Sequence, residues 1–343
     1  MRYENFLERG LIPDSLLRVI LRIHNRIRFQ REEKDIEKRQ EYINGFIREL
    51  KQQPISINVD QANEQHYELP TEFFQIILGE YMKYSCGIWN ENNSDDLTQS
   101  EMDMLKLSCK RAQVHDGDKV MDLGCGWGSL SFYLAENYNL SKIVAVSNSA
   151  TQKRYIEEKA NANRITNLEV IKADIKEFAT EEKFDKILSI EMFEHMRNYE
   201  QLFEKLYNFL KPKGKLFIHI FTDLNYPYFF ELDNPRAFMA KYFFRGGIMP
   251  SADLLFYFAK KFSIENVWRV NGTHYKKTLD TWLKRMKQNK NKIVPLFKAT
   301  YGKENAKKWW NYWKTFFIGC AEAFGSKKGQ KRFVSHYLFQ KEL

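Results

Sequence analysis

The middle of the chain alternates short apolar runs with longer stretches of helical periodicity. Runs rich in Val, Ile and Leu have the length of buried strands. They cover residues 119–122, 143–146, 168–171, 186–190 and 215–220. Apolar positions at helical spacing lie between them, for example over residues 151–162 and 199–210. Strand–helix alternation at this interval predicts an α/β fold with a parallel, doubly wound sheet.

The last third of the chain, from residue 221 onward, is aromatic and rich in helical patterns. Two late runs, at 263–270 and 332–340, have strand character and would complete the sheet. We expect the segments between them, about 221–330, to form a helical cap over the carboxyl-terminal edge of the sheet, where such folds bind ligands. The tryptophan-rich run 309–313 is expected to be the core of this cap. Residues 62–343 are therefore expected to form one domain.

Residues 1–61 predict a helical extension. The run Pro13-Asp14-Ser15 is expected to open one helix, with Asp14 or Ser15 as its cap, and a second helix to cover residues 32–52. In the first helix, apolar residues recur on one face and arginines on another: Leu16, Ile20, Ile23 and Ile27, against Arg18, Arg22 and Arg26. Two interpretations stay open, a helix docked on the main domain or a basic face that touches phospholipid headgroups.

Composition adds little to this picture. The 54 Lys and Arg residues outnumber the 44 Asp and Glu residues, but they are spread along the chain and mixed with acids. We therefore expect mostly solvated surface, with peripheral membrane contact as an option and no nucleic-acid partner. No apolar run has the length of a membrane span, and the first residues lack a signal-peptide pattern. The scattered cysteines (Cys86, Cys109, Cys125 and Cys320) predict reduced thiols, no metal site and a cytoplasmic protein.

A glycine-rich loop, Leu-Gly-Cys-Gly-Trp-Gly at 123–128, follows the first predicted strand. Glycine lets a ligand approach the backbone closely and lets the chain turn sharply. A dinucleotide-binding loop spaces its glycines G-x-G-x-x-G and places an acid on the ribose about 20 residues later. Here the third glycine comes one position early, and the second strand ends in Val146-Ser147-Asn148 without a carboxylate. The pattern favours the D-x-G-x-G-x-G loop of class I methyltransferases, and hence S-adenosylmethionine, over NAD.

The predicted cofactor contacts follow the ends of the first three strands. Asp122 would orient the ammonium group of the cofactor, directly or through water. The other contacts are the loop glycines (Gly124, Gly126 and Gly128), the groups near the ribose (Ser147, Asn148 and Gln152) and the residues flanking the adenine (Asp174 and Ile175). For Asp174, capping of a helix is an equal alternative.

Two carboxylates and an imidazole follow the fourth predicted strand, at Glu191, Glu194 and His195. If they begin a helical turn, their spacing places all three on one face, with Met192 and Phe193 pointing away to pack. Groups this close are expected to perturb one another's pKa values. A salt-bridged strand end is the alternative. An amine methyltransferase needs a proton acceptor and an anionic site for its substrate, and these residues supply both, with His195 as the favoured base.

Several motifs together resemble a known group of enzymes. They are residues 122–128, 147–152 and 189–196, with 10–14, 63–67 around His66, 84–86, 242–251, 270–275 around His274 and 300–303. Over nearly its whole length the chain resembles the coclaurine N-methyltransferase branch of the cyclopropane-fatty-acid synthase superfamily. The resemblance implies a class I sheet under a helical cap, S-adenosylmethionine as cofactor, and contacts to it from Tyr84 and Ser85.

The resemblance covers two chemistries. The synthase branch methylates a lipid double bond with the help of a bicarbonate, which it holds with residues that match Cys86, Glu194, His219 and Tyr275; bicarbonate is therefore a candidate cofactor here. From the residues alone, His219 equally fits a core histidine and Cys86 a small buried residue. Synthases usually have a small residue where this chain has Glu191, and a buried carboxylate favours a cationic amine over an acyl chain. We expect N-methylation of a small-molecule amine, with modification of phospholipid acyl chains as the alternative.

Overall fold

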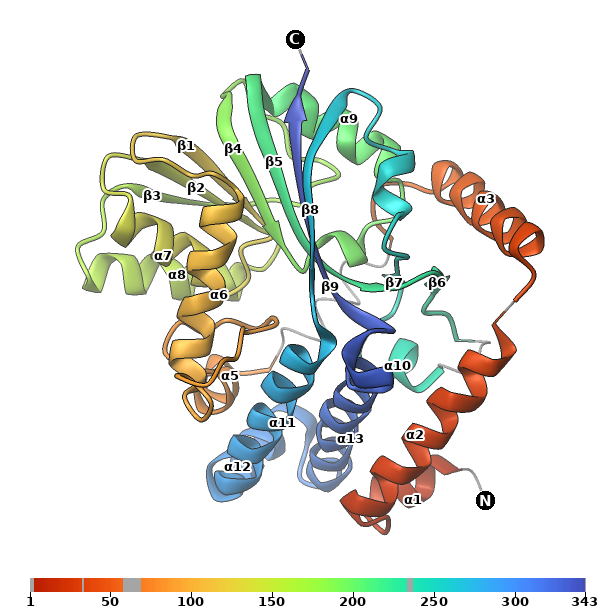
Figure 1. The fold of residues 1–343 in the computed structure, drawn as a ribbon. Coiled ribbons are helices and arrows are strands. Elements are labelled where there is room, and N and C mark those ends of the chain that lie inside the picture. Colours follow the sequence, from red (N-terminus) through yellow and green to blue (C-terminus); the bar gives the residue numbers. More distant parts are fainter. Residues whose placement is uncertain (1–2, 33, 58–68, 233–236, 343) are drawn as a thin grey trace.

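A seven-stranded sheet forms the centre of the molecule (Figure 1). The structure, a computed structural model, describes residues 3–32, 34–57, 69–232 and 237–342. The strands lie in the order β3-β2-β1-β4-β5-β9-β8. Their bounds are β1 Lys119–Leu123, β2 Lys142–Ser147, β3 Leu168–Lys172, β4 Phe184–Ile190, β5 Leu210–Asp223, β8 Phe262–Val270 and β9 Arg332–Lys341. All seven predicted strands are confirmed, and β5 extends beyond its predicted run at both ends.

Helices cover both faces of the sheet, as a parallel sheet requires. Strands β1 to β5 pair in parallel, whereas β9 runs antiparallel to β5 and β8. Successive residues of β5 point to opposite faces: Leu216 packs in the cluster under α9, and Phe217 in the cluster under α6 and α7. The helices of this part are α6 Leu97–Arg111, α7 Ser129–Asn137, α8 Ala150–Ala162 and α9 Tyr199–Phe209. The predicted α/β class is confirmed, with an antiparallel edge added by the two late strands.

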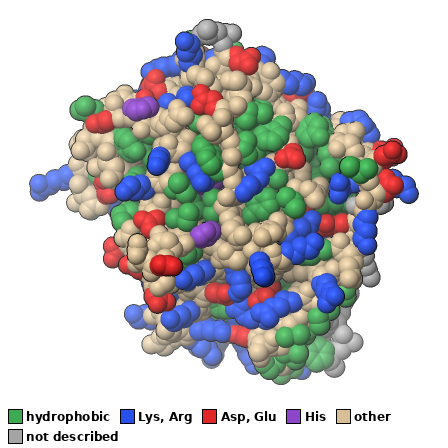
Figure 2. Space-filling model, viewed as in Figure 1, with side chains coloured by type: hydrophobic (Ala, Val, Ile, Leu, Met, Phe, Trp, Pro, Cys, Tyr) green, Lys and Arg blue, Asp and Glu red, His purple; other side chains and the backbone are tan. Residues whose placement is uncertain are grey.

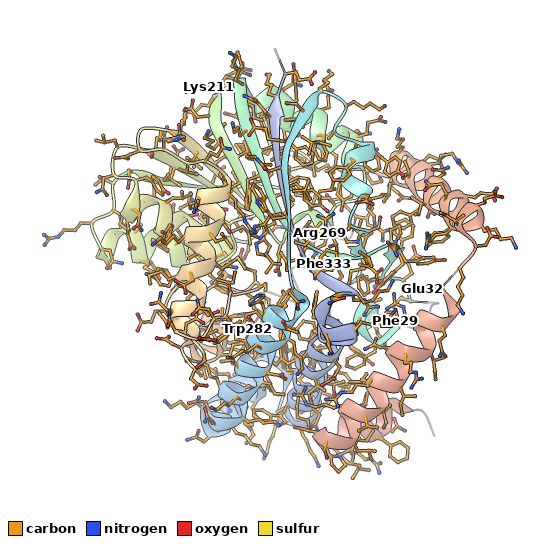
Figure 3. The ribbon with its side chains drawn as sticks, viewed as in Figure 1. Phe29, Glu32, Lys211, Arg269, Trp282 and Phe333 are labelled. Carbon is orange, nitrogen blue, oxygen red and sulfur yellow. The ribbon has the colours of Figure 1, made fainter. Side chains whose placement is uncertain are left out.

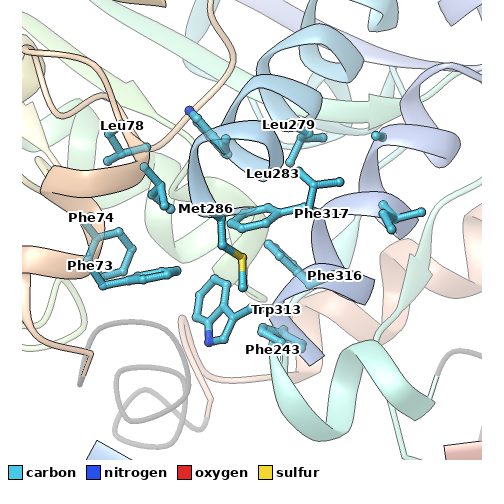
Figure 4. Close-up of a cluster of buried hydrophobic side chains, with 14 of the residues drawn as sticks. Phe73, Phe74, Leu78, Phe243, Leu279, Leu283, Met286, Trp313, Phe316 and Phe317 are labelled. Atoms are coloured by element: carbon cyan, nitrogen blue, oxygen red, sulfur yellow. The ribbon is translucent and has the colours of Figure 1, made fainter. Parts of the chain in front are cut away.

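The cap consists of helices late in the chain and of α5. Its elements are α5 Thr71–Ile77, β6 Tyr228–Phe229, α10 Ala237–Tyr242, β7 Ile248–Met249, α11 Gly272–Gln288, α12 Lys290–Tyr301 and α13 Ala306–Phe324, with short 3₁₀ turns η2 Leu254–Tyr257 and η3 Ser326–Gly329. A buried aromatic cluster joins them, in which Trp313 packs against Phe73, Phe243 and Phe317 (Figure 4). Because Trp313 is fully buried there, the tryptophan-rich run is confirmed as cap core.

Three helices precede the cap in the chain: α1 Tyr3–Arg9, α2 Asp14–Arg31 and α3 Ile36–Gln52. The predicted cap of the first long helix is wrong. Helix α2 begins at Asp14 without a side-chain capping bond, because the Asp14 carboxylate instead pairs with Lys287 and Lys314 of the cap. Helix α3 starts later than predicted, since Asp35 accepts from two backbone amides and caps it. The predicted boundary at residue 61 lies outside the described residues.

Helix α2 is docked on the cap through its arginines. Arg18 donates to Glu322 of α13 over 2.7 Å and to Asp280 of α11 over 2.6 Å, and Arg22 donates to Glu322 over 2.6 Å. The docked interpretation is therefore confirmed, and Leu17 packs in the cap core, but the predicted apolar stripe is largely exposed, with Ile23 54% exposed. In the face seen in Figure 2, basic side chains are spread widely and mixed with acids. Among the described helices, none is long and apolar enough to cross a membrane.

Candidate active site

The glycine-rich loop after β1 depends on left-handed backbone at alternate positions. Gly124, Gly126 and Gly128 have φ values of 78°, 55° and 79°, a region that side chains other than glycine disfavour. A Cβ on Gly124 would lie 2.6 Å from the side chain of Met192, so no larger residue fits there. A Cβ on Gly126 would meet nothing within 4 Å, because this glycine borders an open cavity.

This cavity, here called the loop cavity, lies at the carboxyl ends of β1 to β4. Seven of the predicted cofactor residues line it: Gly124, Gly126, Ser147, Asn148, Gln152, Asp174 and Ile175. The Gln152 side chain accepts a hydrogen bond from the Ser147 hydroxyl over 2.7 Å, while its Nε2 is buried without a partner among the described residues. A buried amide donor that lacks a partner fits a ligand that supplies an acceptor. Asp174 does not cap a helix; its carboxylate closes a turn with the amide of Lys176.

Four predicted cofactor residues lie beside the loop cavity rather than along it. Tyr84 lines the neighbouring cavity described below, and the Ser85 hydroxyl accepts from the buried ammonium of Lys83. Asp122 is buried and accepts from the Ser131 hydroxyl over 2.6 Å, and burial raises the pKa of its carboxyl to about 7. Gly128 packs against α8 where α7 begins. Direct contact of these four residues with the cofactor stays a prediction.

Some residues that line the loop cavity were not predicted. They are Ile57, Leu123, Val146, Ala173, Met192, Met196 and Arg245. Met192 was expected to point away from the site, and this is wrong: it packs on Gly124 and lines the loop cavity. Arg245 stands in the motif at 242–251, so the resemblance marked its segment without giving it a role.

Glu191 directly follows β4, and Glu194 and His195 stand on the short 3₁₀ turn η1 Phe193–His195. Glu191 has a φ of 49°, a strained conformation of the kind that gathers at functional sites. As predicted, Glu191, Glu194 and His195 face one space, and Phe193 packs in the core.

Both oxygens of the Glu191 carboxylate accept hydrogen bonds. Oε1 accepts from the Cys86 amide over 3.0 Å and lies 3.2 Å from Nε2 of His219, and Oε2 accepts from the Tyr275 hydroxyl. These donors come from three separate elements of the fold. Burial raises the pKa of Glu191, while the Lys83 ammonium and the hydrogen bonds from Tyr275 and the Cys86 amide act to lower it.

A directional chain of hydrogen bonds leads to Glu191 from α6. Nη1 of Arg111 lies 2.8 Å from Nδ1 of His336. Because a guanidinium can only donate, Nδ1 of His336 is the acceptor. His336 therefore carries its proton on Nε2 and donates it to Nδ1 of His219 over 2.9 Å. His219 then carries its own proton on Nε2, toward Glu191. Burial lowers the pKa of both histidines well below the usual range, so both are neutral at pH 7.

This arrangement does not fit a bound bicarbonate. Three of the groups that the resemblance assigned to bicarbonate, at Cys86, His219 and Tyr275, already bind the Glu191 carboxylate. The Cys86 thiol donates to the carbonyl of Gly87 instead. A bicarbonate would have to displace the buried Glu191 carboxylate from its own donors.

Glu194 and His195 carry the perturbed ionisation that their spacing predicted. Burial, together with the charge of Glu191, raises the pKa of Glu194 well above its usual value. Its Oε2 is buried and has no hydrogen-bond partner in the described part of the chain. Burial lowers the pKa of His195 to about 4, so its ring is neutral at pH 7. His274 accepts from the amide of Trp89 over 3.0 Å, a structural contact, and His66 lies outside the described residues.

A second cavity, here called the cap cavity, opens between α2, the cap and the ends of β5 and β9. Its volume is about 580 Å³, and most of its wall is aromatic or aliphatic, with Phe221, Phe244 and Phe324 among the rings. Glu191 and His195 line both cavities, so the two spaces meet at these side chains. Among the described residues, no cluster of His, Cys, Asp and Glu has the arrangement of a metal site.

A parallel sheet with a glycine-lined loop after its first strand, and a second cavity meeting the first at the end of β4, defines a class I S-adenosylmethionine-dependent methyltransferase. Residues 56–332 match the family of mycolic acid cyclopropane synthetase. The chain belongs to this family.

Two relatives place it within the family. It is 36% identical to (S)-coclaurine N-methyltransferase of Thalictrum flavum subsp. glaucum, over 98% of this chain and 94% of that protein. Cyclopropane-fatty-acyl-phospholipid synthase of Escherichia coli (strain K12) is 31% identical over 65% of this chain and 56% of that protein. The crystal structure of coclaurine N-methyltransferase bound to N-methylheliamine and SAH superimposes with a TM-score of 0.94 at 36% identity, covering 98% of each chain. The resemblance to the coclaurine N-methyltransferase branch is confirmed.

Proposed function

We propose that this protein transfers the methyl group of S-adenosylmethionine to the nitrogen of a small-molecule amine. The cofactor occupies the loop cavity and the amine enters the cap cavity, so that they meet at Glu191 and His195. Bound there, the cofactor supplies a methyl group on a positively charged sulfur, which departs as a neutral thioether. The seven predicted cofactor residues that line the loop cavity are proposed to hold it, with Asp122 acting on its ammonium group.

The observation that carries this proposal is the buried carboxylate oxygen of Glu194, which has no partner among the described residues. A buried acceptor without a donor costs about 1–3 kcal/mol, and more when the group is charged. Glu194 is one of the residues that line the cap cavity, so the proposed partner of this oxygen is an ammonium N–H of a substrate bound there. An acyl chain offers no donor, which disfavours the lipid alternative. The name of the Thalictrum relative also supports amine methylation.

Glu191, Glu194 and His195, here called the junction residues because they lie at or next to the place where the two cavities meet, have different roles. Glu191, held by its donors, keeps negative charge near the incoming ammonium. A bound cation favours the ionised form of Glu194, which offsets the effect of burial on its pKa. His195 is neutral above a pH of about 4, so one of its ring nitrogens carries no proton. Burial makes the ring a weak base, but the charge of Glu191 opposes that shift, and the ring takes the proton that the ammonium loses before attack. Alignment of the free amine with the methyl group supplies much of the rate enhancement.

Removal of the junction groups tests the proposal. Glu194→Gln and His195→Ala should each lower turnover by about 10²–10⁴-fold, the usual contribution of a general base, with affinity for S-adenosylhomocysteine unchanged in calorimetry. Glu101→Gln is the matched control, because Glu101 is a buried glutamate that binds backbone amides away from both cavities. Wild-type release of S-adenosylhomocysteine from amines by either junction variant would refute the part assigned to the residue it replaces.

Two further proposals concern the setting of the enzyme. A cytoplasmic location remains our expectation, tested by fractionating cells that express the tagged chain. Peripheral membrane contact would use the outward stripe of α2, which includes Leu16 and Ile23. Sedimentation with anionic vesicles tests it, and equal binding by Ile23→Lys would exclude this stripe.

A further inference from the structure

The end of the cap cavity away from Glu194 is lined by two arginines. Arg28 comes from α2, and Arg332 is the first residue of β9. We propose that these two side chains form an anion-binding end of the cap cavity, so that the methyl acceptor is an amine that also carries a carboxylate, phosphate or sulfonate group. This inference rests on the proposed amine methylation and extends it to a class of acceptor.

Both guanidinium groups have hydrogen-bonding capacity to spare. Arg332 is only 3% exposed, and its Nε and Nη2 are buried without a hydrogen-bond partner among the described residues. Arg28 donates from Nη1 to the Tyr228 hydroxyl over 3.2 Å, while its Nε and Nη2 also lack a partner there. Planar guanidinium groups bind carboxylate and phosphate oxygens in pairs of parallel bonds. An anionic group in the cavity would satisfy donors that the protein leaves unused.

Each of the two nearby acids uses one carboxylate oxygen on Lys331, and the other oxygen, Oε1 of Glu32 or Oδ2 of Asp223, is buried without a hydrogen-bond partner among the described residues. Lys331 donates to Asp223 over 2.8 Å and to Glu32 over 2.6 Å, so this buried lysine takes one oxygen from each. The same Asp223 oxygen that pairs with Lys331 also accepts from two backbone amides of its own turn. Its other oxygen lies 3.5 Å from Nε of Arg332, an ion pair without a hydrogen bond. Three cations therefore face two carboxylates, and positive charge remains at this end.

Aromatic rings hold the two arginines in place. The guanidinium carbon of Arg28 lies 4.2 Å from the ring centre of Tyr228, and that of Arg332 lies 6.0 Å from the same ring and 5.3 Å from Phe29. Figure 3 shows Phe29 near the end of α2 that faces the start of β9, where Phe333 is labelled. Stacking of this kind orients a guanidinium without using its N–H groups. The arginines are thus fixed before a ligand arrives.

Strand register sets the length of the acceptor. On the paired strands β5 and β9, His219 faces His336, and Asp223 faces Arg332. His219 contacts Glu191, and Asp223 lies four positions further along the same strand, about 13 Å along the strand axis. The wall between the two ends is apolar, with Phe221 on the same strand. A short amino acid cannot span this distance, so the acceptor has an apolar or aromatic middle between its amine and its anion.

Matched acceptors test the inference. We would compare 4-[4-(methylamino)butyl]benzoate with N-methyl-4-phenylbutylamine, which lacks the carboxylate, by the release of S-adenosylhomocysteine. The wild type should favour the carboxylate by about tenfold or more in kcat/KM, and Arg332→Gln should remove most of that preference. Arg332→Lys should restore part of it, and Arg28→Gln should act in the same direction as Arg332→Gln. Arg269→Gln is the control, because Arg269 stacks on Phe333 and Tyr337 outside the cavity wall.

A purely structural role of the arginines predicts a different outcome. In that case Arg332→Gln lowers the melting temperature and the rates for both amines equally, and the inference is overturned. A wild type that methylates both amines with equal kcat/KM also overturns it, while the proposed function stands. Calorimetry with 4-butylbenzoate, which has no amine, separates the two ideas. Binding to the wild type but not to Arg332→Gln supports the anion site even if no amine is methylated.

Discussion

The loop cavity and the cap cavity meet at Glu191 and His195 but are built by different means. The loop cavity is shaped mainly by backbone, through left-handed glycines and short turns after four neighbouring strands. The cap cavity is shaped by side chains from both ends of the chain. Within the described residues, Glu194, Arg28 and Arg332 keep buried polar atoms there that have no hydrogen-bond partner. Backbone geometry suits a cofactor that never changes, whereas unsatisfied charge selects among acceptors. The predictions below test this division.

The largest effect is expected in the loop cavity. Gly126→Val adds a side chain where the backbone borders open space, so it should lower affinity for S-adenosylhomocysteine by about 100-fold or more, equivalent to about 2.8 kcal/mol. Gly117→Val is a matched control, because Gly117 also has positive φ with nothing within 4 Å but lies before β1, outside both cavities. Left-handed strain should cost each variant about 1–2 kcal/mol of stability. Calorimetry and thermal melts measure both effects, and equal affinity in the two variants would contradict this account.

The difference between backbone-built and side-chain-built regions also explains which features could be predicted from the sequence. Strands and the loop glycines depend on local pattern, so their positions followed from apolar runs and from glycine spacing. The partners of Glu191 depend on tertiary structure, because Cys86, His219 and Tyr275 stand on separate elements. Only the resemblance grouped these three residues, and it assigned them to a bicarbonate site. That Glu191 itself takes those donors could not be read from spacing.

Helix α2 is a second case in which the local pattern did not predict the tertiary contacts. Its apolar residues recur at helical spacing, a pattern that normally marks a docked face. Instead, Leu17 packs in the cap core. Arg18 and Arg22 pair with Glu322, which is buried on α13 and needs cations. The pairing partner lies about 300 residues away in the chain, at a separation of 304 positions for Arg18. Periodicity reports that a helix has two faces, but not which of them meets the core.

The second prediction concerns the hydrogen-bond chain into the junction. His336→Leu breaks the path from Arg111 to His219, which weakens the donor to Glu191 and should raise the pKa of Glu191 further. We expect kcat/KM at pH 7 to fall by about 10-fold, since a hydrogen bond to a charged group is worth about 1.5–3 kcal/mol. The acid limb of the pH–rate profile should move to higher pH.

His336→Gln provides the control for that variant. A glutamine at this position can accept from Arg111 through its oxygen and donate to His219 through its amide nitrogen, so the direction of the chain is kept. It should retain most of the activity and the wild-type profile. Equal losses in the leucine and glutamine variants would mean that His336 acts only through packing.

The third prediction returns to the loop cavity and follows from the pKa of Asp122. Burial raises this pKa to about 7, and a cofactor ammonium held by the carboxylate would lower it. Binding then favours the deprotonated form, so affinity for S-adenosylhomocysteine should fall by about 10-fold per pH unit below pH 7 and level off above it. Asp122→Asn should bind more weakly above pH 7 and lose this dependence. A variant that keeps the wild-type pH dependence would assign the titration to another group.

The smallest effect is expected where α2 meets the cap. Burial acts to raise the pKa of Glu322, but the guanidinium groups of Arg22 and Arg18 outweigh it and hold the pKa below its usual value. This contribution to stability is therefore present above the unfolded pKa of 4.5 and lost as the pH falls through the lower folded value. At neutral pH, Glu322→Gln should loosen α2, seen as faster hydrogen exchange along that helix.

Because α2 supplies Leu17, Ile20 and Arg28 to the cap cavity, the same variant should raise KM for the amine. We expect about a threefold change, since loosening a wall moves the acceptor less than removing a charged group, and kcat should stay near that of the wild type. Glu182→Gln is the control: Glu182 pairs with Lys119 and Lys142 on the surface, remote from the cap. If Glu322→Gln changed affinity for S-adenosylhomocysteine as strongly as it changed KM, the two cavities would be coupled through the cap, and the division between them would fail.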